Sequence, residues 1–475
     1  MKWFGILGLL LTLAFCQRLQ AQTAAVTWTT SYQTMDGWGG ETWRYQPTYS
    51  VEQMSLFFST SAGIGYDILR TNNQGCAETG PCTIAPSTMH EFTTIQNAVS
   101  LGGVSVELSL SPPANLKYSG DLYKSTIGAD GSCVDTSNFS ALAAFTVHWI
   151  QMMQTNGVPV TYLFPFNEPD LSDGGGHCQW NAAGIDAYIK VLGPAMASAG
   201  LSSIQIGITD NADWFSTDLV SPCLNDATCA QYVSIVSAHG YGSNGSPDGT
   251  GTGYCCAAVS AAPTAAGSRH IWMGEINGGF SFKSAVNLWN WDPSMADAML
   301  WARNLHDYLT IANVSAYEYW ELADCCQGED GVGALNDGLS EFDGATVGKR
   351  YYVIGQWSRF VRPGWVRIGA TANPAPGVYL TAFNQPSSGE FAIIAINNGS
   401  NAAVTFSLSG FPTSPSSVTP WTTSGSLNLA QQPNVSVNQA SFTYTLPASS
   451  VTSFVGKSPA TEEPRAPTEL TAVVH

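Results

Sequence analysis

The chain has 475 residues, of which 44% are hydrophobic and only 11% are charged. That length predicts one large domain together with a smaller one, with enough apolar residues for a sizeable core. The formal net charge of −18 arises mainly because lysine and arginine together number only 17, and such a surface repels phosphate backbones, which disfavours nucleic acid as a partner.

Residues 1–21 are typical of a secretory signal. Lys2 provides the positive start, and the uncharged apolar run from Phe4 to Phe15 is too short to span a membrane. No other segment approaches the length of a membrane span. We therefore expect a secreted, extracellular protein with no membrane partner.

The cysteine content points to an oxidising compartment. Removal of the signal leaves ten cysteines between Cys76 and Cys326, an even number that favours disulfides. Two pairs have the spacing of small loop-closing disulfides: Cys76 with Cys82, and Cys223 with Cys229. The pairing of the others stays open, and the Cys–His spacings match no zinc pattern, so no metal site is predicted.

Residues 37–350 alternate between short apolar runs and longer helix-like stretches. Strands are expected at 65–70, 104–110, 160–164, 204–208, 235–239 and 316–320, and helices at 140–154, 183–199 and 294–310. Regular alternation of this kind indicates a parallel sheet, and the length fits eight strand–helix units. The prediction is an α/β fold built on a (β/α)8 TIM barrel.

After Arg350 the pattern changes to short strands separated by turn-forming residues. Runs at 377–383, 390–396, 403–408, 416–421, 427–430 and 440–446 predict an appended all-β sandwich over 351–456. Residues 22–36 contain a strand that we expect to join this sandwich. Residues 457–475 are rich in Pro and Glu and are predicted to be a disordered tail.

Two glutamates stand directly after buried-strand patterns. Glu168 follows Tyr162-Leu-Phe-Pro-Phe-Asn167, and Glu275 ends Ile271-Trp-Met-Gly-Glu275. Catalytic groups of barrels sit at the carboxyl ends of strands, and glycoside hydrolysis needs two carboxyls there. The alternative is a helix-capping Glu168 and a solvated Glu275, but the occurrence of the pair favours an acid/base and a nucleophile.

Several motifs, in order along the chain, carry a family resemblance. They are Gly37-Trp-Gly-Gly40, Ser111-Pro-Pro113, Asn167-Glu-Pro169, Ala238-His-Gly-Tyr241, Trp272-Met-Gly-Glu275, Trp320 and Gly355-Gln-Trp-Ser-Arg-Phe-Val-Arg-Pro-Gly-Trp-Val-Arg-Ile368. With these motifs the chain resembles glycoside hydrolase family 30, and its C-terminal half looks closest to the bacterial xylan-cleaving branch. The resemblance implies a barrel with a side β-sandwich and a retaining mechanism, in which Glu168 is the acid/base and Glu275 the nucleophile.

Two positions depart from that branch. Its members place an Arg shortly after the residue that matches Trp320, where it binds the glucuronyl side group of glucuronoxylan, whereas here the loop reads Glu321-Leu-Ala-Asp-Cys-Cys326. A Trp expected before Pro112 is Leu110. We therefore expect no strict dependence on glucuronyl groups.

The resemblance also implies substrate-binding roles for further residues. Asn167 would bind the sugar 2-OH, Arg70 and Tyr241 would flank the nucleophile, and His239 and Trp320 would line the pocket. For each, a purely structural role is the alternative: a cap, an ion pair or a packed core side chain. Aromatic residues in expected mouth loops are candidates for stacking on sugars, namely Trp43, Tyr118, Trp180, Trp289 and Trp291, with Trp180 placed first.

The sequence thus predicts a secreted, monomeric endo-β-1,4-xylanase that cleaves xylan without strict need for glucuronyl groups and uses no cofactor. Within the same family, an endo-β-1,6-glucanase or a β-glucosidase/glucosylceramidase-like enzyme is the alternative. A non-catalytic carbohydrate-binding protein is a third interpretation, against which the two intact glutamates argue.

Overall fold

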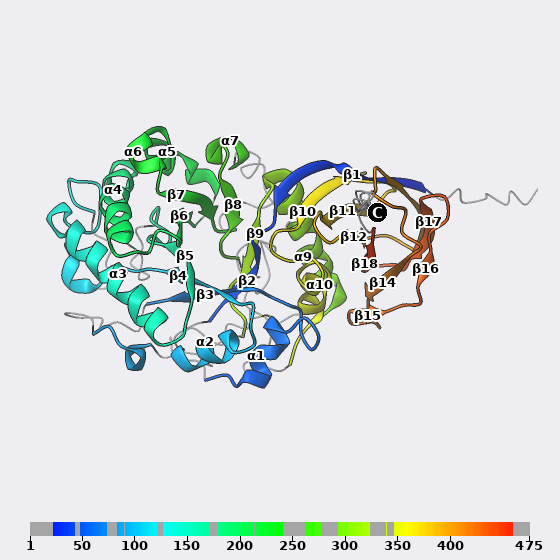
Figure 1. Cartoon of the computed structure of the whole chain (residues 1–475), viewed down its shortest axis with the longest axis horizontal. Helices are drawn as coiled ribbons and strands as arrows, with labels where there is room; N and C mark the ends of the chain where they lie inside the picture. The colour runs from blue at the N-terminus through cyan, green and yellow to red at the C-terminus, as the bar shows by residue number, and fades with distance from the viewer. Residues whose placement is uncertain are drawn as a thin grey trace, which may run out of the picture.

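Two sets of strands make up the fold, a closed barrel and a β-sandwich, and two helices lie between them (Figure 1). The structure is a computed structural model that describes residues 22–42, 48–73, 83–89, 91–120, 127–171, 178–212, 214–240, 262–276, 293–323, 339 and 346–458. Within these ranges, no helix combines the length and the apolarity needed to cross a membrane.

The barrel consists of eight parallel strands in chain order, closed by pairing of the last with the first. They are β2 (Gly37–Glu41), β3 (Ile68–Asn72), β4 (Ser105–Ser109), β5 (Val160–Phe164), β6 (Gln205–Asn211), β7 (Val233–Ala238), β8 (His270–Met273) and β9 (Ala316–Tyr319). These strands are buried on both faces, as parallel strands covered by helices are, so they read as apolar runs. The predicted TIM barrel is confirmed.

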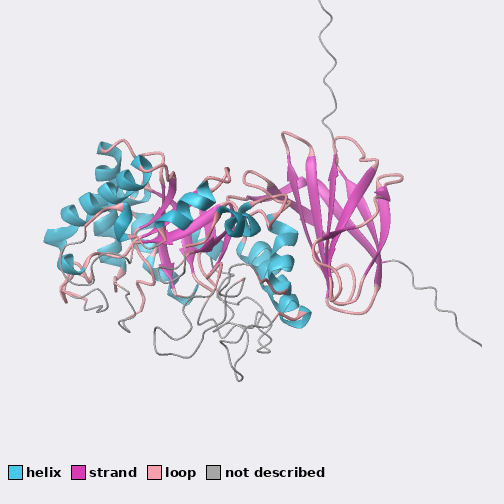
Figure 2. Cartoon of the chain, turned by 90° about the horizontal axis from the view of Figure 1, so that it is seen from below, coloured by secondary structure: helices cyan, strands magenta, loops and turns pink. Residues whose placement is uncertain are grey.

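Helices surround the barrel strands (Figure 2). They are α1 (Val51–Phe58), α2 (Phe92–Val99), α3 (Phe139–Thr155), α4 (Ala182–Ser198), α5 (Ser221–Asn225), α6 (Ala227–Ala230), α7 (Ala262–Ala266), α9 (Met295–Asp307) and α10 (Lys349–Ser358). Side-chain caps fix several starts: Ser50 begins α1, Asn181 begins α4 and Ser294 begins α9. The single helix predicted over 294–310 is instead α9 followed by a π-helical turn, Tyr308–Ala312, which ends where Asn313 adopts a left-handed conformation.

The remaining strands form a ten-stranded, mainly antiparallel sheet that encloses its own apolar core. They are β1 (Gln22–Thr34), β10 (Val366–Ala370), β11 (Val378–Gln385), β12 (Glu390–Asn397), β13 (Ala402–Ser409), β14 (Ser417–Thr423), β15 (Ala430–Gln431), β16 (Val435–Ser436), β17 (Ser441–Leu446) and β18 (Ser450–Lys457). The first strand, β1, pairs antiparallel with β10 and parallel with β13. The predicted C-terminal β-sandwich is therefore present, and it includes a strand from the other end of the described chain.

The barrel and the sandwich share a continuous interface through α9 and α10. Trp357 on α10 donates to the Thr381 hydroxyl on β11 at 2.9 Å, and Gln356 donates to Thr423 on β14 at 2.8 Å. The Arg303 guanidinium on α9 lies 3.4 Å from the ring centre of Tyr379. Buried polar contacts of this kind fix the relative position of the two parts, since each would be costly to leave unpaired.

Candidate active site

The two predicted glutamates lie together at the carboxyl ends of the barrel strands. Glu168 follows β5, has a positive φ of 47°, and its main-chain N–H donates to the carbonyl of Asp210 at 2.8 Å. Glu275 follows β8, and its carbonyl accepts from the N–H of Gly240 at 2.7 Å. A carboxylate oxygen of Glu168 lies within 4.8 Å of one of Glu275. The side chains are only 10% and 13% exposed.

A glycine before Glu275 allows the main chain to pass close to the side chains of Asp210 and Ser237. A Cβ at Gly274 would lie 2.4 Å from both the Asp210 carboxylate and the Ser237 hydroxyl, closer than real Cβ contacts. The same two side chains are joined by a 2.5 Å hydrogen bond from Ser237 to Asp210. Gly274 therefore lets the segment that carries Glu275 pass directly over β6 and β7.

Arg70 is the central cation of the site. Strand register aligns Glu41 on β2 with Arg70 on β3, and Arg70 with Glu107 on β4. Nη1 of Arg70 donates to both Glu41 and Glu275, and Nε donates to Glu107 at 3.2 Å. Nη2 lies 3.2 Å from Oδ2 of Asp210. A single guanidinium thus contacts four carboxyl groups.

The environment of Arg70 changes the proton affinities of the groups around it. Burial alone would lower the pKa of Arg70, but the four carboxylates outweigh it and raise the pKa well above its ordinary value. Burial raises the pKa of Glu41 to about 7 and that of Glu107 to about 8, although Arg70 acts in the opposite direction. The guanidinium stays charged, while these two carboxyls titrate near neutrality.

His239 is a second buried basic residue, located directly after β7. Its Nδ1 lies 3.0 Å from Oε1 of Glu168 and 3.7 Å from Oε1 of Glu275, and its Nε2 lies 3.5 Å from Oδ2 of Asp210. Burial opposes charge on the ring, but Glu275 and Asp210 raise the pKa of His239 well above its ordinary value. Burial would likewise raise the pKa of Asp210, yet His239 and Arg70 lower it below its ordinary value.

Two further predicted residues lie at the same end of the barrel. Oδ1 of Asn167 accepts a 2.7 Å hydrogen bond from Nη2 of Arg70. Trp320 follows β9 and is partly buried. Its main-chain N–H donates to the carbonyl of Ile276 at 2.9 Å. The structure therefore brings together Arg70, Asn167, Glu168, His239 and Glu275, with Trp320 on the segment next to them. Trp43, Tyr241, Trp289 and Trp291 fall outside the described residues.

Trp180, the aromatic placed first for sugar stacking, occupies a different environment. Its side chain is almost fully buried, with 2% of the residue exposed, and the indole packs against the rings of Phe139, Phe166 and Tyr188. A ring enclosed on these sides has no open face for a sugar, so the stacking role assigned to Trp180 is not supported. Tyr118, by contrast, is 43% exposed, and its hydroxyl donates to Asp130 at 2.6 Å.

A disulfide connects two loops beside the site. Cys133 lies in the loop that follows β4, and Cys178 lies in the loop that follows β5, with a Cα–Cα distance of 5.5 Å. The sequence left this pairing open. Main-chain hydrogen bonds support the link, since the N–H of Cys133 donates to the carbonyl of Gln179 at 2.9 Å. The disulfide therefore links the loop after β4 to the loop after β5, which also carries Glu168.

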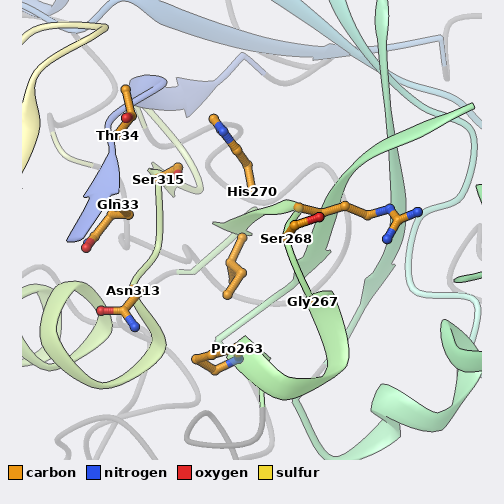
Figure 3. A pocket seen from close by; sticks show the side chains of 10 residues that line it. Gln33, Thr34, Pro263, Gly267, Ser268, His270, Asn313 and Ser315 are labelled. Carbon is orange, nitrogen blue, oxygen red and sulfur yellow. The ribbon is translucent and has the colours of Figure 1, made fainter. Parts of the chain in front are cut away.

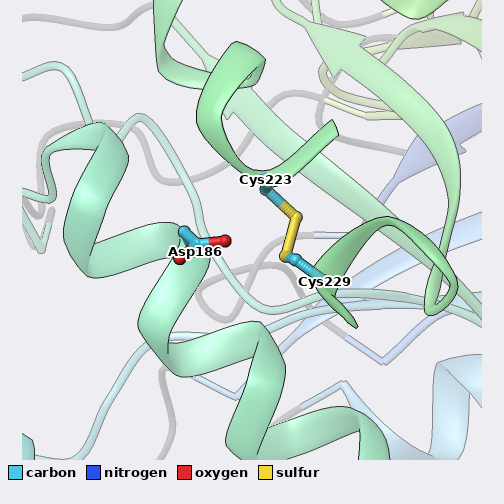
Figure 4. Close-up of side chains that lie close together, drawn as sticks. All are labelled: Asp186, Cys223 and Cys229. Carbon is cyan, nitrogen blue, oxygen red and sulfur yellow. A yellow bond between two sulfur atoms is a disulfide. The ribbon is translucent and has the colours of Figure 1, made fainter. Parts of the chain in front are cut away.

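The second disulfide, Cys223–Cys229, was predicted from its spacing and joins α5 to α6. Asp186 on α4 lies beside it, so that three residue types found in metal sites are close together (Figure 4). The two sulfurs are bonded to each other and are not thiolates, so they do not provide the ligands that zinc prefers. Asp186 instead pairs with Lys190 at 2.7 Å.

A cavity of about 260 Å³ lies at the opposite end of the barrel (Figure 3). Its lining includes His270, which begins β8, and Ser315, which precedes β9. These are the amino ends of the strands, whereas Glu168 and Glu275 follow the carboxyl ends. The cavity is therefore not part of the candidate active site.

Some residues of the site were not singled out in the sequence. Glu41, Glu107 and Asp210 all contact Arg70, and Ser237 orients Asp210. A signal was present, because a charged residue between two apolar residues of a strand, such as Glu107 between Val106 and Leu108 in β4, needs a buried partner of opposite charge.

Comparisons with known proteins identify the family of the chain. A sequence model described as O-glycosyl hydrolase family 30 matches residues 95–333, and one described as the glycosyl hydrolase family 30 β-sandwich domain matches residues 364–454. Glucuronoxylanase XynC of Bacillus subtilis strain 168 is 25% identical over 467 residues, which cover 95% of this chain and 96% of XynC.

Solved structures give the same picture. Xyn30A of Clostridium acetobutylicum, a xylanase of family 30 subfamily 8, is similar with a TM-score of 0.72 and 27% identity, covering 92% of this chain and 99% of that one. An endo-β-1,6-glucanase has a TM-score of 0.68 and 20% identity, covering 92% and 94% of the two chains. At 20% identity, the similarity to the glucanase shows a shared fold and nothing about the substrate of this chain.

Proposed function

Because the chain belongs to glycoside hydrolase family 30, we propose that it is a secreted endo-β-1,4-xylanase that does not strictly require glucuronyl groups on xylan. It acts by double displacement, with Glu168 as acid/base and Glu275 as nucleophile. It works as a monomer. The predicted signal segment and the two disulfides among the described residues support secretion.

The proximity of the two carboxyls is the observation that carries the mechanism. Oxygens of Glu168 and Glu275 lie within 4.8 Å of each other, closer than the roughly 6.5–9.5 Å that separates the carboxyls of inverting enzymes, which accommodate a water. Retaining enzymes hold their carboxyl groups roughly 5–5.5 Å apart, so that one of them attacks the sugar directly. The geometry therefore favours a covalent glycosyl-enzyme.

The first step forms that intermediate. Glu168 donates its proton to the glycosidic oxygen as the C1–O bond breaks, and a carboxylate oxygen of Glu275 bonds to C1. In the second step Glu168 removes a proton from water, the water oxygen bonds to C1, and the bond to Glu275 breaks. Arg70 binds the Glu275 carboxylate, so it holds the nucleophile in position before attack.

Asn167 is proposed to bind the sugar 2-OH. Its Oδ1 accepts from Arg70 at 2.7 Å, and this bond determines which way the amide points. The amide nitrogen is then left to donate to the sugar, in a hydrogen bond that strengthens as the transition state forms. Trp320 is proposed as a pocket wall, and the roles of Trp43 and Tyr241 rest on the family motifs.

Two relatives favour xylan as the substrate, namely the glucuronoxylanase XynC and the xylanase Xyn30A, at 25% and 27% identity over most of the chain. The loop after Trp320 lacks the Arg that would bind a glucuronyl carboxylate. A carboxylate needs a fixed cation for selective binding, so plain xylan should serve as well as glucuronoxylan.

The test is the product profile on glucuronoxylan, arabinoxylan and β-1,6-glucan, with Glu275→Gln as the inactive control. Comparable release of xylo-oligosaccharides from both xylans supports the proposal. Release that needs the glucuronyl groups would overturn the independence from them. Glucose oligomers from β-1,6-glucan, without xylan cleavage, would replace the substrate while keeping both catalytic glutamates.

A further inference from the structure

Glu41 shares a nitrogen of Arg70 with the nucleophile. Nη1 of Arg70 donates to Oε2 of Glu41 and to Oε2 of Glu275, and Oε1 of Glu41 accepts from Nδ2 of Asn72 at 3.0 Å. Glu41 is at the end of β2 and is only 3% exposed. Neither step of the proposed mechanism uses Glu41. It is nevertheless a buried carboxyl that is separated from the Glu275 carboxylate only by Nη1 of Arg70.

Charged groups face Glu41 from several barrel elements. Arg70 comes from β3, Glu107 from β4, His239 from the segment after β7 and Glu275 from the segment after β8. Glu318 and Asp210 extend the acidic surroundings from β9 and β6. Burial is the largest influence on Glu41 and raises its pKa to about 7, with Glu275 adding to the increase and Arg70, Asn72 and His239 opposing it.

A charge count indicates which carboxyls are neutral in mildly acidic solution. The buried cations of the cluster among the described residues are Arg70 and His239. The lowered pKa of Asp210 and the nucleophilic role of Glu275 account for two negative charges. Ionisation of Glu41 adds a third, which no further cation in the cluster balances.

We propose that Glu41 is a positioning residue that sets the reactivity of Glu275 through their shared bond to Arg70, so that the charge on Glu41 speeds the first displacement and slows the second. This inference rests on the proposed function, since it assigns Glu275 as the nucleophile.

The direction follows from where negative charge moves. In the first step Glu275 gives up its negative charge as its oxygen bonds to C1, so a neighbouring negative charge on Glu41 favours that step. In the second step the C1–O bond to Glu275 breaks and the electron pair returns to the Glu275 carboxylate. A negative charge on Glu41 disfavours this step, because it repels the charge that returns to Glu275. A basic carboxylate is a better nucleophile and a poorer leaving group.

The experiment is Glu41→Gln, assayed with dinitrophenyl β-xylobioside. Its leaving group needs no proton, so kcat/KM reports the first step and kcat reports the second, a division that a pre-steady-state burst of dinitrophenol verifies. The glutamine amide oxygen still accepts from Arg70 but carries no charge. At a pH well above 7, Glu41→Gln should lower kcat/KM and raise kcat, each by roughly threefold or more. At a pH well below 7 both constants should match those of the unaltered enzyme.

A second variant guards against a folding defect. Asn72→Ala removes the amide that donates to Glu41, so the neutral form of Glu41 should persist to higher pH and the same opposite changes should appear near pH 7. Glu52→Gln, at an exposed site on α1, is the matched control and should change neither constant.

Three outcomes distinguish the inference from the function on which it rests. Opposite changes in kcat and kcat/KM that appear only at high pH support the role of Glu41. Equal losses in both constants at every pH would mean that Glu41 is merely structural and would overturn it. A fluorosugar that labels no residue, together with the absence of a burst, would overturn the double displacement itself.

Discussion

Nδ1 of His239 lies 3.0 Å from the carboxylate of Glu168, and the histidine is fully buried. Three carboxylates raise the pKa of this histidine well above its ordinary value despite its burial. The proposed acid/base therefore has a cation as its immediate neighbour. A cation in this place favours the ionised form of Glu168, which is the form that removes a proton from water in the second step.

Replacement of His239 should move the basic limb of the pH profile. His239→Asn removes the positive charge beside Glu168, so Glu168 should keep its proton to higher pH, and the basic limb of kcat/KM on xylan should move to higher pH. His148→Asn on the exposed side of α3 is the control and should leave the limb in place. A lowered limb would contradict the assignment of Glu168 as the acid.

Glu168→Gln should affect natural and activated substrates differently. Loss of the acid should lower kcat/KM on xylan by about 10²–10⁴-fold, whereas dinitrophenyl β-xylobioside, whose leaving group departs unprotonated, should retain much of its kcat/KM. Initial rates on the two substrates are the measurement. An equal loss on both would show that Glu168 is not the proton donor.

Glu275→Gln should abolish turnover of both kinds of substrate, because no covalent intermediate then forms. The smaller Glu275→Gly leaves space for azide, which should attack the opposite face of C1 and give a glycosyl azide of inverted configuration. Product configuration is read by NMR. An azide product of retained configuration, or labelling of a different residue by a fluorosugar, would assign the nucleophile elsewhere.

The stability of the fold should fall as the pH rises toward 8. Burial raises the pKa of Glu41 and Asp67 to about 7 and of Glu107 to about 8, from ordinary values near 4. The folded state therefore binds more protons than the unfolded chain between those limits. The stabilisation is complete below the unfolded pKa and is lost as the pH passes the folded pKa. Thermal unfolding from pH 5 to 8 measures the slope, and Glu107→Gln should make it shallower; a Tm that rises with pH over this range would contradict the raised values.

Removal of the two disulfides should have unequal effects. Cys133–Cys178 closes a loop with a sequence separation of 45, and Cys223–Cys229 closes one of 6. In the chain-entropy account, loss of the longer link costs about 4 kcal/mol and loss of the shorter about 2 kcal/mol. Double Cys→Ser variants of each pair, compared by denaturant unfolding, test the order. An equal or reversed order would mean that local packing, and not loop closure, determines the contribution of each disulfide.

Much of the architecture could be predicted because local patterns decide it. The run Val160–Phe164 is apolar without interruption and forms β5 with those limits. Helix ends were less predictable: the helix begun by Ser294 changes to a π-helical turn after Asp307, where Tyr308 and Leu309 are fully buried in a core that the local sequence does not specify.

The site was predictable only in part, for a physical reason. Glu168 and Glu275 each come shortly after a strand in the sequence. Their position at the carboxyl end of the barrel therefore follows once those strands are recognised. The contacts of Glu41, Glu107 and Asp210 with Arg70 depend on strand register and on which faces point inward, and neither is encoded in any one segment. Trp180 shows the same limit, because its neighbours Phe139 and Tyr188 come from α3 and α4.

The pairing of β1 with β10 and β13 makes the barrel an insertion within the sandwich. The first strand of the described chain to leave the ribosome has no partners until β10 and β13 have been made. A catalytic fragment that ends after α10 would keep the 13-residue β1 as an unpaired strand. Its free main-chain N–H and C=O groups would promote aggregation. An engineer who wants the barrel alone must therefore cut at both ends, whereas a circular permutant that joins β18 to β1 would turn the sandwich into one continuous stretch of sequence.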